Sequence, residues 1–422
     1  MKKTIVSALA LLLGIGAFAF EPVTYTYDTS KQEPFELNVP VPDGNYLVTM
    51  KIGSAKKAGR TFVKAESRRL FVNDLQTAKK EFKTVQFVIN KRDYIIRENG
   101  TETKVTLKMR ENGKYNWDDN LNLEILGEAP VVESITIEPA SGVTTVFLAG
   151  DSTVVDQDNE PWASWGQMFP WFFDTNVAVA NYAESGERAD TFMGAGRLKK
   201  ILSVMNPGDY VFIEFGHNDM KLQGPGKDGY YFFALQLKMM IDEVRAKGGI
   251  PVLVTPTHRR NFDADGHIVE SHGDYPDGMR WVAEHEGVQL IDLHNMSALF
   301  YEALGVEGSK SAFVHFKGGI YGGMPNDTAD NTHFNPYGAF ELAKCVVSEL
   351  VHQHFPLEKH IVNFSGFDPS YPDARESFHW VDTPYHDLAV QVSEKDDKAT
   401  EVPAPGQQPQ GPQGGPQGGP RR

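Results

Sequence analysis

The residues whose types could perform nucleophilic chemistry lie in two short stretches far apart in the chain. Ser152 stands in Gly-Asp-Ser-Thr-Val (150–154), and His333 follows Asp330 by three positions in Asp-Asn-Thr-His (330–333). This spacing lets the carboxylate reach the imidazole Nδ1 and hold the tautomer, which leaves Nε2 free to accept a serine proton. Together these residue types indicate acyl transfer through an activated serine.

Each of the two stretches also has a simpler interpretation. A serine behind a strand commonly caps the next helix. An Asp-x-x-His pair is weak evidence alone, because histidine is often only a hydrogen-bonded polar residue. Val154 occupies the position where the nucleophile elbow of α/β-hydrolases requires glycine, so the serine stretch is not that motif.

Two more polar stretches could donate hydrogen bonds to a developing oxyanion. Gly186, in Ala-Glu-Ser-Gly-Glu-Arg (183–188), could turn its amide towards a ligand, although an ordinary turn glycine is the simpler interpretation. Asn218, in Phe-Gly-His-Asn-Asp (215–219), could supply its side-chain amide, or the same residues could cap a helix.

A parallel sheet is needed to bring these stretches together. Between about residues 143 and 355, apolar runs at 145–149, 177–182, 210–215, 250–255 and 288–293 alternate with helical stretches. The helical stretches are 192–205, 230–247, 276–286 and 336–352. The pattern predicts a three-layer, doubly wound α/β domain, whose sites lie at the carboxyl ends of its strands. Three of the polar stretches follow such runs, and the Asp330–His333 stretch is predicted as a late loop.

The rest of the chain divides into four segments. Residues 21–140 alternate apolar and polar positions, at 46–52, 84–89, 103–109, 121–126 and 131–139, with turn residues between them, which predicts an antiparallel β-sandwich. Residues 1–20 have the basic, apolar and small-residue pattern of a signal peptide, so we expect export to the periplasm or the medium. Residues 356–393 form a C-terminal extension, and the Pro/Gly/Gln-rich tail at 394–422 is predicted to be disordered.

Composition excludes several classes of partner. The net charge of -15 disfavours binding to nucleic acid and to anionic membranes, and no segment after the signal peptide is apolar enough to insert. The single cysteine, Cys345, lies in an apolar helical run and is predicted to be a buried thiol. His258, His267 and His272 are close in sequence but lack a metal-ligand pattern.

Taken together, the four polar stretches resemble the SGNH (GDSL-type) hydrolase superfamily over about residues 144–350. Within it, the stretches at 150–154, 207–219, 252–262 and 330–334 resemble the rhamnogalacturonan acetylesterases, carbohydrate esterase family 12. The resemblance implies a flavodoxin-like α/β/α fold, a Ser152–His333–Asp330 triad, and an oxyanion hole formed by the amides of Ser152 and Gly186 with Asn218 Nδ2. It implies removal of acetyl groups from rhamnogalacturonan, a pectin backbone, without a metal or other cofactor.

Substrate contacts and rival functions stay open at this point. Arg188, Arg259 and Arg260 could bind galacturonate carboxylates, although surface solvation or helix-end pairing explains each of them at least as well. Trp165 could stack on a sugar, but core packing is the better interpretation. The N-terminal region resembles galactose-binding-like sandwiches. An esterase with the same triad could act on acetylated xylan or another ester, and a non-catalytic carbohydrate-binding protein is the alternative of another class. The sequence leaves the oligomeric state open.

Overall fold

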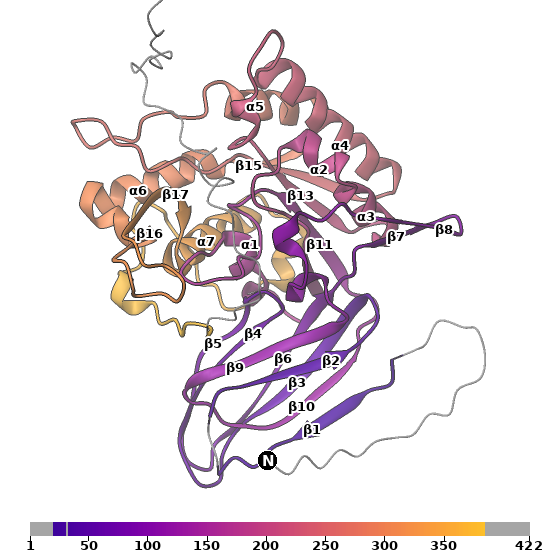
Figure 1. The fold of residues 1–422 in the computed structure, drawn as a ribbon, viewed down its shortest axis with the longest axis vertical. Coiled ribbons are helices and arrows are strands. Elements are labelled where there is room, and N and C mark those ends of the chain that lie inside the picture. Colours follow the sequence, from indigo (N-terminus) through magenta and orange to yellow (C-terminus); the bar gives the residue numbers. More distant parts are fainter. Residues whose placement is uncertain (1–19, 31–32, 385–422) are drawn as a thin grey trace, which may run out of the picture.

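The computed structural model describes residues 20–30 and 33–384. The predicted signal peptide, apart from Phe20, and the predicted tail lie outside these residues. A β-rich N-terminal part occupies the bottom of Figure 1, and an α/β part that holds the candidate site lies above it. No helix of the part that the structure describes is both long and apolar enough to cross a membrane.

The N-terminal part contains two four-stranded antiparallel sheets, as predicted. Their strand orders are β1-β10-β3-β6 and β2-β9-β4-β5. The strands are β1 (Val23–Thr26), β2 (Phe35–Pro40), β3 (Gly44–Gly53), β4 (Gly59–Ala65), β5 (Arg69–Thr77), β6 (Phe82–Lys91), β9 (Asn120–Ala129) and β10 (Val132–Pro139). Alternate side chains, such as Val48, Met50 and Ile52 of β3, form a shared apolar core, which explains the period of two in the sequence.

One predicted strand of this region is shorter than expected. The run at 103–109 was predicted as a strand, but β8 ends at Lys104 and pairs only with β7 (Ile95–Glu98) in an exposed hairpin. The chain then crosses to the α/β part through the 3₁₀ turns η1 (Met109–Glu111) and η2 (Tyr115–Trp117). Trp117 packs in the core of the α/β part, and Glu111 pairs with the buried Arg197, so tertiary contacts override the local strand pattern.

The α/β part is built on a five-stranded parallel sheet of order β12-β11-β13-β14-β15. Its strands are β11 (Thr144–Gly150), β12 (Val177–Asn181), β13 (Tyr210–Glu214), β14 (Ile250–Val254) and β15 (Gln289–Ile291). This is the 2-1-3-4-5 order of flavodoxin-like folds, so the predicted fold class is confirmed. A separate antiparallel pair, β16 (Phe313–Phe316) and β17 (Thr328–Phe334), lies beside the last helix.

Helices cover both faces of the parallel sheet. They are α1 (Trp165–Met168), α2 (Ala189–Gly194), α3 (Arg197–Val204), α4 (Ala234–Ala246), α5 (Tyr275–Glu286), α6 (Leu293–Gly308) and α7 (Pro336–His352). The short helical turns of this part are η3 (Phe169–Phe172), η4 (Asp219–Lys221), η5 (Gly229–Phe233), η6 (Ser309–Ala312), η7 (Pro356–His360) and η8 (Arg375–Ser377). The predicted helix at 192–205 is two helices, because Gly196 adopts a left-handed φ of 81° between them. Helix α6 was not predicted.

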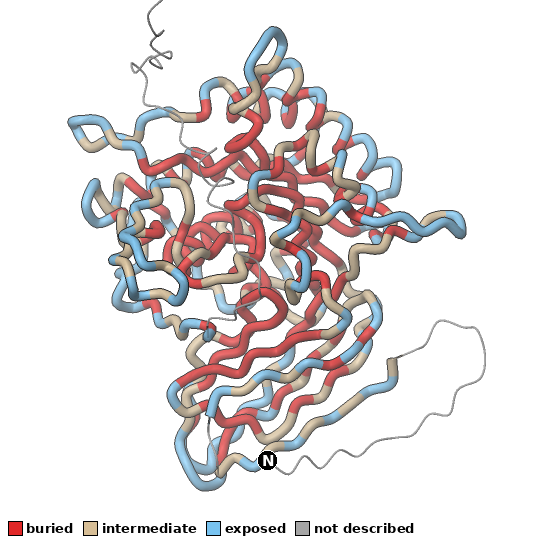
Figure 2. The backbone as a smooth tube through the Cα atoms, in the orientation of Figure 1, coloured by how far each residue is buried: buried red, intermediate tan, exposed pale blue. Residues whose placement is uncertain are grey.

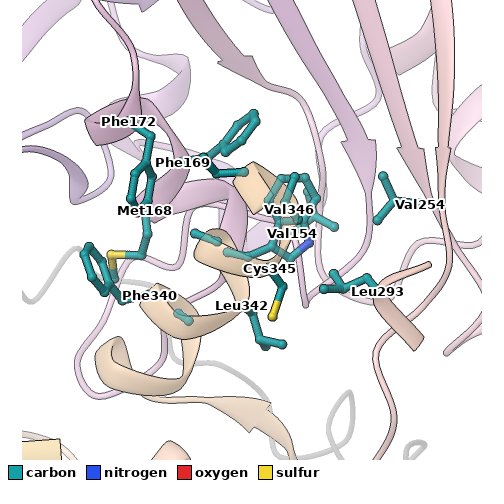
Figure 3. Close-up of a cluster of buried hydrophobic side chains, with 14 of the residues drawn as sticks. Val154, Met168, Phe169, Phe172, Val254, Leu293, Phe340, Leu342, Cys345 and Val346 are labelled. Carbon is teal, nitrogen blue, oxygen red and sulfur yellow. The ribbon is translucent and has the colours of Figure 1, made fainter. Parts of the chain in front are cut away.

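Successive side chains of β11 point to opposite faces of the sheet, which gives the domain three layers with an apolar core on each face. Val146 and Leu148 point into the first core, and Phe147 and Ala149 point into the second. Both cores are buried, as the red central strands of Figure 2 show. Figure 3 shows the first core, where α7 brings Cys345 among apolar neighbours; this confirms the predicted buried thiol.

Candidate active site

Ser152 lies in a tight turn at the carboxyl end of β11. The amides of Val154 and Val155 both donate to the carbonyl of Asp151, but no helix begins there, and the next helix starts only at Trp165. The helix-capping interpretation of Ser152 is therefore wrong. Its side chain is free for another role, and the residue is 8% exposed.

Asp330 and His333 lie on a strand rather than in the predicted loop. Strand β17 pairs with β16, and a register irregularity interrupts this pairing between Ala329 and Phe334 of β17, the stretch that contains both residues. One carboxylate oxygen of Asp330 accepts hydrogen bonds from the amides of Thr332 (2.7 Å) and His333 (3.0 Å). This local turn fixes the carboxylate with its second oxygen facing the imidazole.

The three side chains form one hydrogen-bonded chain. His333 Nδ1 lies 2.6 Å from Asp330 Oδ2, and His333 Nε2 lies 2.9 Å from Ser152 Oγ. Burial alone would raise the pKa of Asp330, but the charge and hydrogen bonds of His333 and the backbone amides outweigh it and lower that pKa to about 2. Asp330 is therefore ionised at neutral pH and holds the Nδ1 proton, so Nε2 can accept a proton from the serine hydroxyl.

Two predicted oxyanion donors lie on neighbouring loops. Gly186 follows β12 with a φ of 75°, a left-handed conformation that glycine adopts without strain. Asn218 follows β13, and its Nδ2 donates to the carbonyl of Glu187 (3.0 Å) while its Oδ1 accepts from Lys221 Nζ (2.8 Å). These partners fix the orientation of the amide, whose Nδ2 carries a second proton. Asn218 precedes η4, but its side chain makes no capping bond.

Buried carboxylates lie beneath this site. Glu214, the last residue of β13, accepts hydrogen bonds from Thr153 Oγ1 and Trp165 Nε1, both at 2.7 Å. Burial, together with the nearby charge of Asp151, raises the pKa of Glu214 to about 8. Trp165 is 0% exposed, so its predicted role as a sugar platform is wrong. Its indole belongs to the core and orients Glu214.

Glu214 should make folding stability fall as the pH rises. Its folded pKa of about 8 exceeds the ordinary 4.5, so between these values the folded chain holds a proton that the unfolded chain has lost. The free energy of unfolding should then fall by up to ~1.4 kcal/mol per pH unit from this group. We expect Glu214→Gln to gain stability relative to the wild type between pH 5 and pH 8 in thermal unfolding. An equal pH dependence in both proteins, or the same gain in the exposed control Glu376→Gln, would contradict this.

The three candidate arginines differ in position. Arg188 pairs with Asp190 at 2.9 Å at the start of α2. Arg260 is buried and donates to Ser309 Oγ (2.9 Å), Asn331 Oδ1 (3.0 Å) and a main-chain carbonyl. Their partners are thus within the protein, and their binding of substrate stays a prediction.

Arg259 joins two of the site stretches. It donates to Thr332 Oγ1 (2.9 Å), beside His333, and to the carbonyl of His217 (3.2 Å), beside Asn218. Lys221, which the sequence analysis missed, lies on the other side of Asn218. Burial and then the charge of Arg259 lower the pKa of Lys221 to about 8. The signal for Lys221 was its position three residues after Asn218, one turn of a short helix.

The N-terminal part also reaches the loop that holds Gly186. Lys108 Nζ lies 2.5 Å from the carbonyl of Ser185 and 3.0 Å from Glu187 Oε1. Arg110 pairs with Glu184 at 2.7 Å and also donates to Ser185. The predicted division into a sandwich and a separate hydrolase domain did not anticipate these contacts, since the segment 105–118 packs against the candidate site.

The doubly wound α/β domain and the hydrogen-bonded arrangement of Ser152, His333 and Asp330 indicate the class of esterases and acylhydrolases. The sequence profile of the GDSL-like Lipase/Acylhydrolase family matches residues 148–339. The chain belongs to this family, and it is therefore an esterase or acylhydrolase related to rhamnogalacturonan acetylesterases.

Several known proteins are similar to this chain. Rhamnogalacturonan acetylesterase RhgT of Bacillus subtilis is 41% identical over 223 residues, which cover 52% of this chain and 95% of that protein. A rhamnogalacturonan acetylesterase of Emericella nidulans is 25% identical over 52% of this chain and 89% of its own length. The crystal structure of Bacillus subtilis YxiM is 26% identical, covers 79% of this chain and 85% of that one, and superposes with a TM-score of 0.46.

Proposed function

We propose that this protein is a serine esterase that removes acetyl groups from a polysaccharide containing galacturonate, with rhamnogalacturonan as the substrate. The observation that carries the proposal is the aligned chain Ser152 Oγ, His333 Nε2, His333 Nδ1 and Asp330 Oδ2, with contacts of 2.9 and 2.6 Å. This geometry supports general-base activation of a serine hydroxyl, and it requires no metal at the serine.

The proposed reaction has two steps. In the first, His333 Nε2 takes the proton of Ser152 as Oγ attacks the acetyl carbonyl, and the oxyanion accepts donors from Gly186, Asn218 and the amide of Ser152. The protonated His333 then gives its proton to the departing sugar oxygen, which leaves an acetyl group on Ser152. In the second step, His333 deprotonates a water molecule that attacks the acetyl carbonyl, and acetate is released.

Two cations beside the site support an acidic sugar as the substrate. In the part of the chain that the structure describes, neither Lys221 nor Arg259 has a carboxylate oxygen within 4.0 Å of its side-chain nitrogens. Their charges lie close enough that Arg259 lowers the pKa of Lys221, and the negative charge of the buried Asp151 only partly offsets this effect. A carboxylate placed between them would relieve this repulsion and would accept charge-assisted hydrogen bonds. The net charge of -15 makes such local cations necessary for a pectin substrate.

The names of two relatives support the same substrate. RhgT and the Emericella nidulans relative are both named as rhamnogalacturonan acetylesterases.

We also propose that the protein is exported. Residues 1–20 have the composition of a signal peptide, and export would bring the enzyme to pectin, an extracellular polymer.

Acetate release from two polymers tests the proposed substrate. We expect faster release from acetylated rhamnogalacturonan than from acetylated xylan. Lys221→Met should raise KM for the pectin substrate about tenfold, since one charge-assisted hydrogen bond is lost. The same variant should leave KM for a neutral aryl acetate unchanged. Lys227→Met, on the following loop, is the matched control.

The neutral substrate separates the possible results. Equal losses of Lys221→Met on both substrates would mean that Lys221 acts only by orienting Asn218, which would count against carboxylate binding. Faster release from xylan than from rhamnogalacturonan would overturn the pectin proposal and leave the serine mechanism in place.

A further inference from the structure

Four side chains that the proposed esterase mechanism does not use meet behind the site. They are His258, in the loop after β14, Glu270 and His272, in the segment before α5, and His294, near the start of α6. One possible ligand atom of each lies within 4.8 Å of those of all the others. The three histidines are buried, and Glu270 reaches the surface. His267, which is closest to them in sequence, lies outside the cluster, 3.6 Å from Glu302.

Two of these histidines have nitrogens without a hydrogen-bond partner. His258 Nδ1 and His272 Nε2 are buried, and neither has a partner among the described residues. His272 is 0% exposed. Burying a polar atom without a hydrogen-bond partner costs free energy, so such an atom in a native structure calls for an explanation, for example a bound ion. A neutral imidazole nitrogen with a free lone pair is a common metal ligand.

The two ring nitrogens of His294 have the partners that are typical of a metal-binding histidine. Its Nδ1 lies 2.7 Å from the carbonyl of Pro256, which can only accept a hydrogen bond, so Nδ1 carries a proton. Its Nε2 lies 2.7 Å from Glu270 Oε2. Either a second proton lies between these two atoms or a cation takes both lone pairs. A ligand histidine typically donates its other N–H to a backbone carbonyl in this way.

We propose that His258, Glu270, His272 and His294 bind one divalent first-row transition metal ion of the Zn²⁺ type. Three imidazoles and one carboxylate suit such an ion, whereas Ca²⁺ and Mg²⁺ prefer oxygen ligands. Around a tetrahedral ion, ligand atoms are about 3.4 Å apart, given Zn–N bonds of about 2.0–2.1 Å. The ligand atoms that are up to 4.8 Å apart must therefore move closer, whereas His294 Nε2 and Glu270 Oε2, now 2.7 Å apart, must separate. The stacked rings of His258 and His294, now 3.5 Å apart between centroids, must tilt as the ion enters. Glu270 gives the ion a path from solvent.

The ion would have a structural role. It would tie the loop after β14 and the segment before α5 to the start of α6. The ring of His272 also lies edge-on against that of His217, with 4.5 Å between centroids, and His217 precedes Asn218. The metal would thus support the loop that holds Asn218 without contacting Ser152, so this inference does not depend on the proposed ester substrate.

Metal binding can be measured on the full chain, purified without a polyhistidine tag and stripped with a chelator. We expect one Zn²⁺ per chain with a Kd on the order of 1 μM or lower, the visible absorption of tetrahedral Co²⁺ on substitution, and a rise of several degrees in Tm on adding Zn²⁺. Glu270→Gln and His258→Gln should each weaken Kd about tenfold or more. His285→Gln, an exposed histidine on α5, is the control.

Two results would overturn the proposal. One is the absence of saturable binding at micromolar Zn²⁺ or Co²⁺, which would leave His294 and Glu270 as a simple ion pair. The other is binding that is equally strong in Glu270→Gln and His258→Gln, which would place the ion elsewhere. Glu270 is half-exposed at its side chain, so Glu270→Gln should fold even if His258→Gln does not.

Discussion

Ser152→Ala should lower kcat for ester hydrolysis on the order of 10⁶-fold, as removal of the nucleophile does in other serine hydrolases. Ser152 Oγ is the hydroxyl that lies against the base His333 Nε2, and alanine has no side-chain atom to accept the acetyl group. The Tm should change little, because the substitution removes one side-chain hydrogen bond, the one between Ser152 Oγ and His333 Nε2. Acetate release from an aryl acetate, measured beside thermal unfolding, checks both expectations.

Ser203→Ala is a suitable control, since Ser203 lies on α3 and its Oγ donates to the carbonyl of Lys200, one turn earlier in the same helix. Turnover by a clean preparation of Ser152→Ala near the wild-type rate would refute Ser152 as the nucleophile. A folded wild type that neither releases acetate nor reacts with a fluorophosphonate would instead favour the carbohydrate-binding alternative. The substitution therefore separates an incorrect nucleophile from an incorrect class of protein.

The parts of the fold that depend on local pattern could be predicted from the sequence. Strand β11 is a continuous apolar run because both of its faces are buried, and this alone distinguishes it from the alternating strands of the sandwich. Asp330 and His333 were recognisable together because their contact spans only three residues. The helix break at Gly196 was missed, since an isolated glycine within a helical pattern is often tolerated.

The rest of the site depends on contacts between distant residues, which no local pattern encodes. Lys108 meets Ser185 across 77 positions, and its segment looked like a continuing strand. Trp165 lies in an aromatic stretch whose spacing does not tell which side chains face the core. His294 joins His258 only through α6, which the sequence analysis did not identify as a helix. The metal proposal therefore required the structure.

Asp330→Asn tests the part of the site that local geometry specifies most fully. Asparagine keeps the shape of the side chain but has no negative charge, and its amide can donate to Nδ1, which leaves the proton on Nε2 and blocks the transfer from Ser152. We expect kcat to fall about 10⁴-fold with little change in KM, as for the same substitution in another serine–histidine–aspartate triad. Initial rates on an aryl acetate measure both constants.

Asp330→Asn should also alter acid stability, which provides a second readout. The folded pKa of about 2 lies below the ordinary value of 3.8, so the ionised carboxylate stabilises the fold above about pH 4, and this contribution is lost as the pH falls towards 2. The variant lacks that contribution, so its Tm deficit should shrink on acidification. Asp265→Asn, an exposed residue in the loop after β14, is the matched control. A loss of kcat below tenfold would mean that His333 is oriented without Asp330, and the site would then be a serine–histidine pair rather than a triad.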